Sequence, residues 1–335
     1  MTPVAVEVWR GPRVESRHRV SVMVADGSGR TILALGDIDR PIYPRSAVKP
    51  FQALPLLETG AADALGVTEA ELALACASHS AEPSHLELVG SWLARLGVDD
   101  EALVCGPHAP LHAASAEALI RAGLQPRKIH NNCSGKHTGM LTLAKHLGVS
   151  LEGYAEPEHP VQRLVRATME ELTDGAVERD MGIDGCGLPT FAMPLRALAT
   201  AFARFASPEA LGPDRARAAR RVGEAMRRHP QLVAGTGRCC SAVMTALPGV
   251  LAKTGAEGVY VAAVAGRGLG IALKAEDGAG RAAEVALLAI LDRLGLIDGG
   301  AAAELASFAT PTLRNAAGRI VGRIAPAEGW LAQRT

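Results

Sequence analysis

The sequence has no excess of charge of either sign. Its 335 residues include 35 acidic and 35 basic ones, so the formal net charge is zero at pH 7 with neutral histidines. Proteins that bind nucleic acid or anionic membranes usually carry a strongly basic surface. We therefore expect neither a nucleic acid nor a membrane as a partner.

Long hydrophobic runs are also missing. The longest apolar stretch, residues 259–265, ends at Gly266 and Arg267, well short of the length that spans a bilayer. The N-terminal residues lack the basic segment and apolar core of a signal peptide. These absences predict a soluble, cytoplasmic protein. In that compartment we expect the six cysteines to be thiols, core residues or metal ligands rather than disulfides.

The sequence also contains few lysines. There are six lysines against 29 arginines, so this sequence uses arginine wherever a surface charge suffices. Arginine stays charged in proteins, whereas lysine can lose its proton and act as a base. The positions that kept lysine therefore point to chemistry, and three of them, Lys49, Lys136 and Lys253, stand in motifs.

Hydrophobic periodicity predicts strands at both ends of a helical middle. Residues rich in β-branched side chains predict strands at 4–10, 17–25, 31–36, 249–253, 258–264, 269–275 and 319–324. Apolar positions at helical spacing predict helices at 46–59, 68–77, 84–96, 114–122, 135–147, 160–172, 195–205, 213–228 and 281–294. This order predicts an α/β (α+β) fold, with an antiparallel sheet from both termini and an inserted helical subdomain. Within one domain of residues 1–335, we assign about 1–65 and 232–330 to the sheet and about 66–231 to the helices.

The most informative motif is Ser46-Ala47-Val48-Lys49, followed by Pro50. Side chains three residues apart lie on one face of a helix, so a neutral lysine could take the proton of the serine and make it a nucleophile. Proline favours the first turn of a helix. The helix should therefore start near Ser46 and direct its amides at an oxyanion. A second Ser/Thr-x-x-Lys match, at Thr142 and Lys145, shows that the spacing alone is not specific.

The loop at residues 76–85 holds Ser78, Ser80, Glu82 and two histidines. It is either part of an active site or a polar connection that caps the next helix, with Ser84 as N-cap. Residues 134–138 and the glycines at 266–270 lack the full spacing or the following helix of a nucleotide-binding loop.

Cys133 has a lysine and a histidine close in sequence, and Cys186 stands in a glycine turn at the end of a predicted strand, where we expect it to be exposed. Together they could hold a soft metal ion, or each cysteine could be a small core residue. Both interpretations stand on the residues alone.

Lys253-Thr254-Gly255, late in the chain, completes a larger pattern. An early Ser-x-x-Lys and a late Lys-Thr-Gly on either side of a helical insert is the motif order of the serine β-lactamase and penicillin-binding superfamily. In that arrangement the glycine would let substrate approach the strand. The middle Ser-Asp-Asn element is absent, and Ser78 could replace its hydroxyl.

Five segments together resemble the rhizobial-type L-asparaginases, the asparaginase II family. These segments are residues 45–50, 76–80, 132–137, 184–190 and 235–238, and the resemblance extends from about residue 4 to residue 325. The resemblance implies a serine β-lactamase/glutaminase-like fold, a homodimer and two Ser–Lys pairs, Ser46 with Lys49 and Ser78 with Lys253. It also implies a zinc (Zn) site formed by Cys133, Lys136 and Cys186, with Asp184 and His137 nearby. The adjacent Cys239 and Cys240 and the short tail depart from the family pattern.

We therefore expect an amidohydrolase that converts L-asparagine to L-aspartate and ammonia through an acyl-enzyme. The alternatives are a β-lactamase-like esterase or peptidase and a non-catalytic zinc-binding protein. We expect Ser46 to attack, because its lysine is held locally, and Ser78 to relay a proton with Lys253 holding it in place.

Overall fold

The computed structural model describes residues 1–332 and forms two compact units. The first, which we call the sheet unit, comprises Met1–Ala47, Met193–Ser207 and the chain from Ala242 onward. The second, the helical unit, comprises Val48–Ala192 and Pro208–Ser241. Compared with the boundaries expected from the sequence, residues 48–65 and 232–241 belong to the helical unit instead of the sheet unit, and residues 193–207 belong to the sheet unit.

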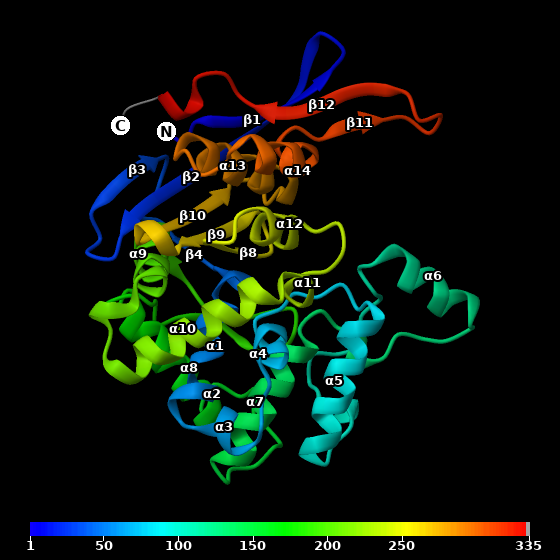
Figure 1. The fold of residues 1–335 in the computed structure, drawn as a ribbon, viewed down its shortest axis with the longest axis vertical. Coiled ribbons are helices and arrows are strands. Elements are labelled where there is room, and N and C mark those ends of the chain that lie inside the picture. Colours follow the sequence, from blue (N-terminus) through cyan, green and yellow to red (C-terminus); the bar gives the residue numbers. More distant parts are fainter. Residues whose placement is uncertain (333–335) are drawn as a thin grey trace. The chain divides into compact units, whose positions relative to one another are not determined.

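The sheet unit contains an antiparallel sheet of eight strands drawn from both ends of the chain. The strand order is β11-β12-β1-β2-β10-β9-β8, and β3 also pairs with β2. In Figure 1, β8, β9 and β10 lie side by side next to β2. The predicted α+β class, with an antiparallel sheet built from the two termini, is confirmed. The strands are β1 (Val4–Arg10), β2 (Arg13–Asp26), β3 (Thr31–Leu35), β8 (Val250–Thr254), β9 (Val259–Val264), β10 (Leu269–Ala275), β11 (Thr312–Arg314) and β12 (Ile320–Pro326), and a small pair joins β4 (Pro41–Ile42) to β7 (Met193–Pro194).

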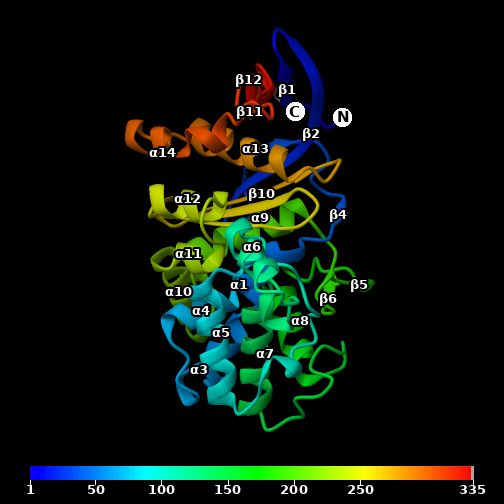
Figure 2. The same ribbon diagram turned by 90° about the vertical axis from the view of Figure 1, so that its right-hand side faces the viewer.

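Helices cover both faces of this sheet. Helix α9 (Leu195–Ala206) packs on one face, against β10 and β2, and α13 (Gly280–Arg293) packs on the opposite face (Figure 2). Because both faces are covered, β9 is buried along its whole length, and its sequence is a continuous apolar run rather than an alternating one. Helix α14 (Gly299–Ala309) packs beside α13.

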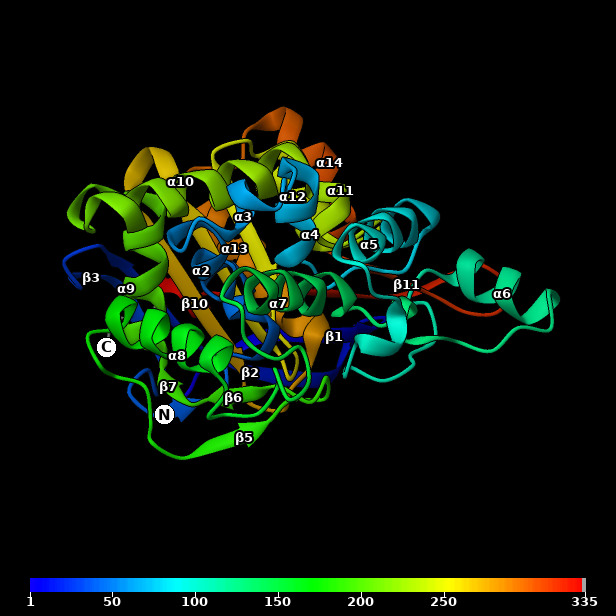
Figure 3. The same cartoon turned by 90° about the horizontal axis from the view of Figure 1, so that it is seen from below.

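The helical unit is arranged around α7 (Ser134–His146), which is buried from Ser134 to Ala144. Figure 3 shows α7 running between α8 and α5. A helix that is buried on every side needs no amphipathic pattern, and α7 has none. The other elements are α1 (Lys49–Gln52), α2 (Leu54–Glu58), α3 (Ala61–Ala64), α4 (Glu69–Ala75), α5 (Pro83–Leu96), α6 (Ala113–Arg121), α8 (Pro160–Leu172), α10 (Pro213–Arg228), α11 (Pro230–Val233) and the hairpin of β5 (Met181–Ile183) and β6 (Pro189–Phe191); α12 (Cys239–Ala246) leads the chain back to the sheet unit.

The helix predicted over residues 46–59 is the clearest local error. The structure has a 3₁₀ turn, η1 (Arg45–Val48), followed by α1 and α2, with Ala53 between these two helices. Pro50 and Pro55 each stand in the first turn of a short helix, where the missing N–H costs nothing. Two prolines this close divide the segment. Helix α14 and strand β11 were not predicted. Within residues 1–332, no helix is long and apolar enough to cross a membrane.

The contact between α9 and β10 depends on Gly270. A Cβ at this position would lie 1.9 Å from the Ala199 carbonyl oxygen and 2.3 Å from the Ala203 nitrogen. Gly270→Ala should therefore lower the free energy of unfolding by about 3 kcal/mol or more, measured by urea denaturation. Gly249→Ala is the control, since a Cβ there meets nothing within 4 Å. Equal stability of the two variants would contradict this packing.

Candidate functional site

Lys49 is the centre of the candidate site in the helical unit. The side chain is 0% exposed, and its Nζ donates hydrogen bonds to the Ala77 carbonyl oxygen and, over 3.1 Å, to Ser78 Oγ. A buried amine must find protein partners, because leaving it unpaired is costly. The lysine that the sequence assigned to Ser46 thus contacts the second candidate serine, 29 residues along the chain.

The loop that carries Ser78 is buried and tightly held. Residues 76–81 are all buried, and the Ser78 amide donates to the Val233 carbonyl oxygen over 2.9 Å. Ala81 adopts a left-handed backbone conformation with φ 57°, which is costly for a residue with a Cβ. Such strain in a buried loop is typical of functional segments.

Ser46 lies in η1 and is half-buried, directly after Arg45, which also has a left-handed backbone with φ 53°. In the same sheet unit, Lys253 on β8 is 0% exposed and donates from Nζ to the Thr254 carbonyl oxygen over 2.9 Å. The two segments are close, because the Pro44 carbonyl oxygen lies 2.5 Å from where a Cβ of Gly255 would stand. The glycine of the Lys-Thr-Gly motif therefore accommodates the chain's own backbone here. The pairs Ser46–Lys49 and Ser78–Lys253 stay predictions.

Two neutral histidines fix the Ser78 loop. The Ala81 amide donates to His79 Nδ1 over 3.1 Å, so Nε2 carries the proton and donates to Ser134 Oγ over 2.8 Å. Likewise, the Glu82 amide donates to His85 Nδ1, and His85 Nε2 donates to the Gln231 carbonyl oxygen. Burial lowers the pKa of both imidazoles, and in His79 the nearby basic groups of His85 and Lys49 oppose a second positive charge and so lower the pKa further.

Glu82, and not Ser84, is the N-cap residue of α5. The two interpretations of the 76–85 loop are therefore compatible. The same loop caps α5 and holds Ser78 against Lys49.

The structure brings Cys133, Lys136 and Cys186 together. Lys136 Nζ donates to Cys186 Sγ over 3.1 Å, and the two cysteine side chains hydrogen-bond to each other. That bond, with the charges of Lys49 and Lys136, lowers the pKa of Cys133, although burial opposes the shift. Cys186 is buried, so the expectation that its turn exposes it was wrong; the turn between β5 and β6 points the thiol inward.

The donor set suits a zinc ion. Two sulfurs and one amine nitrogen are donors of the kind that Zn²⁺ accepts, and three protein ligands leave a fourth position open. Across residues 1–332, no group of three or more His, Cys, Asp and Glu side chains could hold a metal, so Lys136 would have to be the third ligand. Beside the set, His137 is 0% exposed, with Nδ1 2.7 Å from the Tyr154 hydroxyl and no partner for Nε2 within the described chain.

All six cysteines are buried, and no disulfide joins any of the residues described. Burial raises the pKa of Cys105 to about 12, which keeps it protonated. No local sequence pattern indicates that Lys49 acts on both the Ser78 loop and Cys133, because these residues are far apart in the chain and the contacts are purely tertiary.

The L-asparaginase II family model matches residues 6–326 of the chain. No curated protein sequence matches it. Among solved structures, it is similar to a β-lactamase from Mycobacterium bovis, with 14% identity, 86% of this chain and 94% of that chain covered, and a TM-score of 0.39. Mglu in its tris and glutamate form has 17% identity, 89% and 65% coverage and a TM-score of 0.39. Unliganded simvastatin synthase from Aspergillus terreus has 13% identity, 87% and 94% coverage and a TM-score of 0.38. Structural similarities this weak assign no substrate.

The neutral histidines make stability depend on pH. Above about pH 6.5, the ordinary pKa of histidine, folded and unfolded imidazoles are both neutral. As the pH falls below that value, the unfolded chain takes up protons that buried His79 and His85 resist. The free energy of unfolding should therefore fall by up to about 1.4 kcal/mol per pH unit for each of them. Urea unfolding between about pH 7 and about pH 5.5 measures this slope.

His85→Gln should reduce the slope by about one histidine's share. His146, exposed on α7, supplies the control His146→Gln, which should leave the slope unchanged. If the free energy of unfolding changes with pH equally in the unmodified protein, His85→Gln and His146→Gln, then His85 is protonated in the folded protein.

Proposed function

Because the chain belongs to the L-asparaginase II family, we propose that it hydrolyses L-asparagine to L-aspartate and ammonia through a serine acyl-enzyme. The family match supports a hydrolase acting on a small amide. The observation that carries the chemistry is the buried contact of Lys49 Nζ with Ser78 Oγ. It gives a potential base a hydroxyl neighbour in a region closed to water, where proton transfer can be directed.

In the proposed reaction, Ser46 Oγ attacks the side-chain carboxamide carbon, and Lys49, as a neutral amine, takes the hydroxyl proton. Lys49 passes a proton through Ser78, 3.1 Å away, to the leaving nitrogen. The C–N bond breaks, ammonia departs, and the aspartyl group is left as an ester on Ser46. Water then attacks the ester carbon, and Lys49 takes a proton from it and returns this proton to Ser46 Oγ as the acyl C–O bond breaks and L-aspartate is released.

Ser46 is preferred over Ser78 for two reasons. It precedes its lysine by only three residues, so we expect the pair to need no distant segment to bring it together. It also leaves the Lys49–Ser78 contact free for the relay. Lys253 would add positive charge near the developing oxyanion.

We also propose that Cys133, Lys136 and Cys186 hold one zinc ion. A zinc ion there would stabilise the pocket and present an electrophilic position to the substrate. The acyl transfer stays with the serines and lysines, because a nucleophile is already available. The homodimer and the cytoplasmic location stay predictions of the family resemblance.

Ammonia release from L-asparagine tests the activity. Ser46→Ala and Lys49→Arg should each reduce turnover by at least about 1,000-fold, because one removes the nucleophile and the other replaces the base with a permanent cation. Ser78→Ala should still form an acyl-enzyme, only slowly. Intact-protein mass spectrometry with an electrophilic asparagine analogue identifies the labelled residue.

Ser91→Ala is the control, since Ser91 Oγ only donates to the Leu88 carbonyl oxygen on the exposed part of α5. Label on Ser78, or label that persists in Ser46→Ala, would reverse the two serine roles. Turnover of penicillin at a comparable rate would argue for the β-lactamase-like alternative.

Elemental analysis of the purified protein tests the metal proposal. We expect one zinc per chain, retained in Cys105→Ala and lost in Cys186→Ala, because Cys186 is a proposed ligand while the Cys105 thiol contacts the Lys128 carbonyl oxygen. Full zinc content in Cys186→Ala, or none in the unmodified protein, would rule this ligand set out.

A further inference from the structure

Arg238 is an arginine without a carboxylate partner beside the serine loop. Within residues 1–332 it forms no ion pair, whereas Arg215 in the same unit binds both Glu58 and Glu171. Arg238 is partly exposed, and its Nη1 lies 3.5 Å from Ser80 Oγ, at the long limit of a hydrogen bond. Its guanidinium therefore keeps donors available for an anion.

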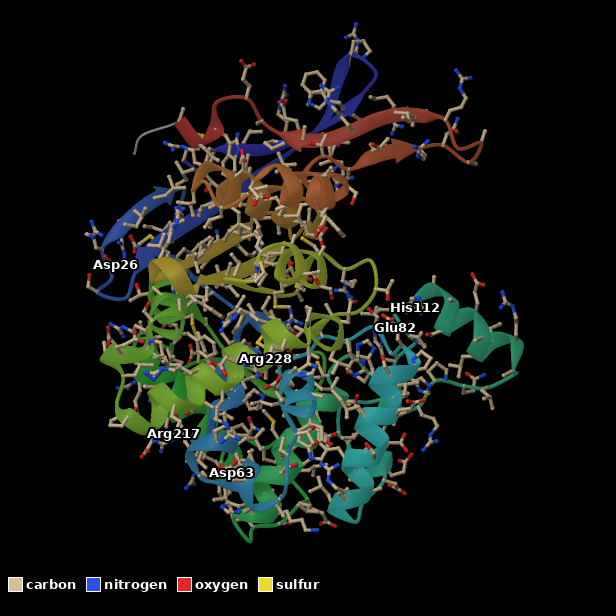
Figure 4. The ribbon with its side chains drawn as sticks, viewed as in Figure 1. Asp26, Asp63, Glu82, His112, Arg217 and Arg228 are labelled. Carbon is tan, nitrogen blue, oxygen red and sulfur yellow. The ribbon has the colours of Figure 1, made fainter. Side chains whose placement is uncertain are left out.

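The segment that carries Arg238 is held rigidly against the serine loop. The Glu82 carboxylate accepts from the Thr236 amide over 2.7 Å and from the Thr236 hydroxyl over 2.8 Å. Figure 4 shows Glu82 at the start of α5, close to His112. Ser80 Oγ also donates to the Ala234 carbonyl oxygen over 2.8 Å.

Gly235 makes this close approach possible. Its φ is 118°, and a Cβ there would lie 2.4 Å from Glu82 Oε1 and 2.8 Å from Ser80 Oγ. The two loops are thus fitted together without space for a side chain. A positively charged group on so well anchored a segment is pre-organised to bind a ligand.

Ser80 follows Ser78 by two residues, a span of about 6.5 Å in extended chain. An L-asparagine molecule reaches roughly the same distance from its α-carboxylate to its side-chain amide. We propose that Arg238 binds the α-carboxylate of the amino-acid substrate and so determines specificity; this rests on the proposed asparaginase activity. A planar guanidinium binds a carboxylate through two parallel hydrogen bonds, which lysine cannot reproduce.

The test compares L-asparagine with 3-aminopropanamide, the same molecule without its α-carboxylate. Arg238→Gln should raise KM for L-asparagine by about 10- to 100-fold and change kcat by less than about 3-fold, because a charged hydrogen-bonded contact to the bound substrate is lost. For 3-aminopropanamide, kcat/KM should stay within about 3-fold of the unmodified enzyme. Arg238→Lys should have a KM for L-asparagine between those of the unmodified enzyme and Arg238→Gln, because lysine keeps the positive charge but cannot form two parallel hydrogen bonds.

Arg121→Gln is the matched control, because Arg121 lies exposed on α6 and pairs with Glu117. It should leave both substrates unchanged. An equal loss on both substrates in Arg238→Gln would show that Arg238 only supports the fold and would overturn the proposal. The proposal would also be overturned if Arg238→Gln kept the same preference for L-asparagine over 3-aminopropanamide as the unmodified enzyme.

A binding measurement separates this inference from the proposed activity. Calorimetry measures the binding of L-aspartate and of 3-aminopropanoate without any turnover. Arg238→Gln should weaken the binding of L-aspartate by about 10- to 100-fold and leave the binding of 3-aminopropanoate unchanged. If the unmodified protein releases no ammonia from L-asparagine but shows this difference, the activity fails and the carboxylate site stands. If ammonia is released and L-aspartate binding is unaffected by the substitution, the activity stands and the role of Arg238 is overturned.

Discussion

The buried amine of Lys49 is the constraint on which the candidate site depends. An amine that water cannot reach has to be surrounded by protein acceptors, and the Ala77 carbonyl oxygen and Ser78 Oγ supply them. Meeting this need holds the end of α4 against α1, and it buries the serine loop with the lysine. The cost of an unpaired buried amine thus keeps a reactive pair together before any substrate arrives.

Helix α7 supports both halves of the site in the helical unit. Ser134, in its first turn, accepts the hydrogen bond of His79 from the serine loop, while Cys133 and Lys136 form the sulfur and nitrogen cluster with Cys186. The helix is buried almost throughout, so its position is determined by packing on all sides. Side chains on such an element are held more precisely than side chains on a surface loop.

The sequence predicted what local patterns encode and failed where long-range contacts decide. All strands of the sheet except β11, and the helix over Pro160–Leu172, follow from periodicity, and the Ser46–Lys49 spacing is visible directly. The contact of Lys49 with Ser78 joins residues 29 apart, and that of Arg238 with Ser80 joins residues 158 apart. No local pattern encodes either contact, because the first depends on how the segment after α4 lies against α1 and the second on how α4 and α11 pack.

Backbone strain adds an independent argument for the two serine segments. Only four non-glycine residues between Met1 and Ala332 have a positive φ; one of them, Arg45, directly precedes Ser46, and another, Ala81, follows Ser78 by three residues. Each left-handed conformation costs roughly 1–2 kcal/mol, and a chain free to move would leave it. A packed surrounding keeps such a conformation only when it outweighs that cost. In the Ser78 loop, the hydrogen bonds from His79 to Ser134 and from Ser80 to Ala234 offset this cost. The same bonds that hold Ala81 in its strained conformation therefore also orient Ser78 towards Lys49.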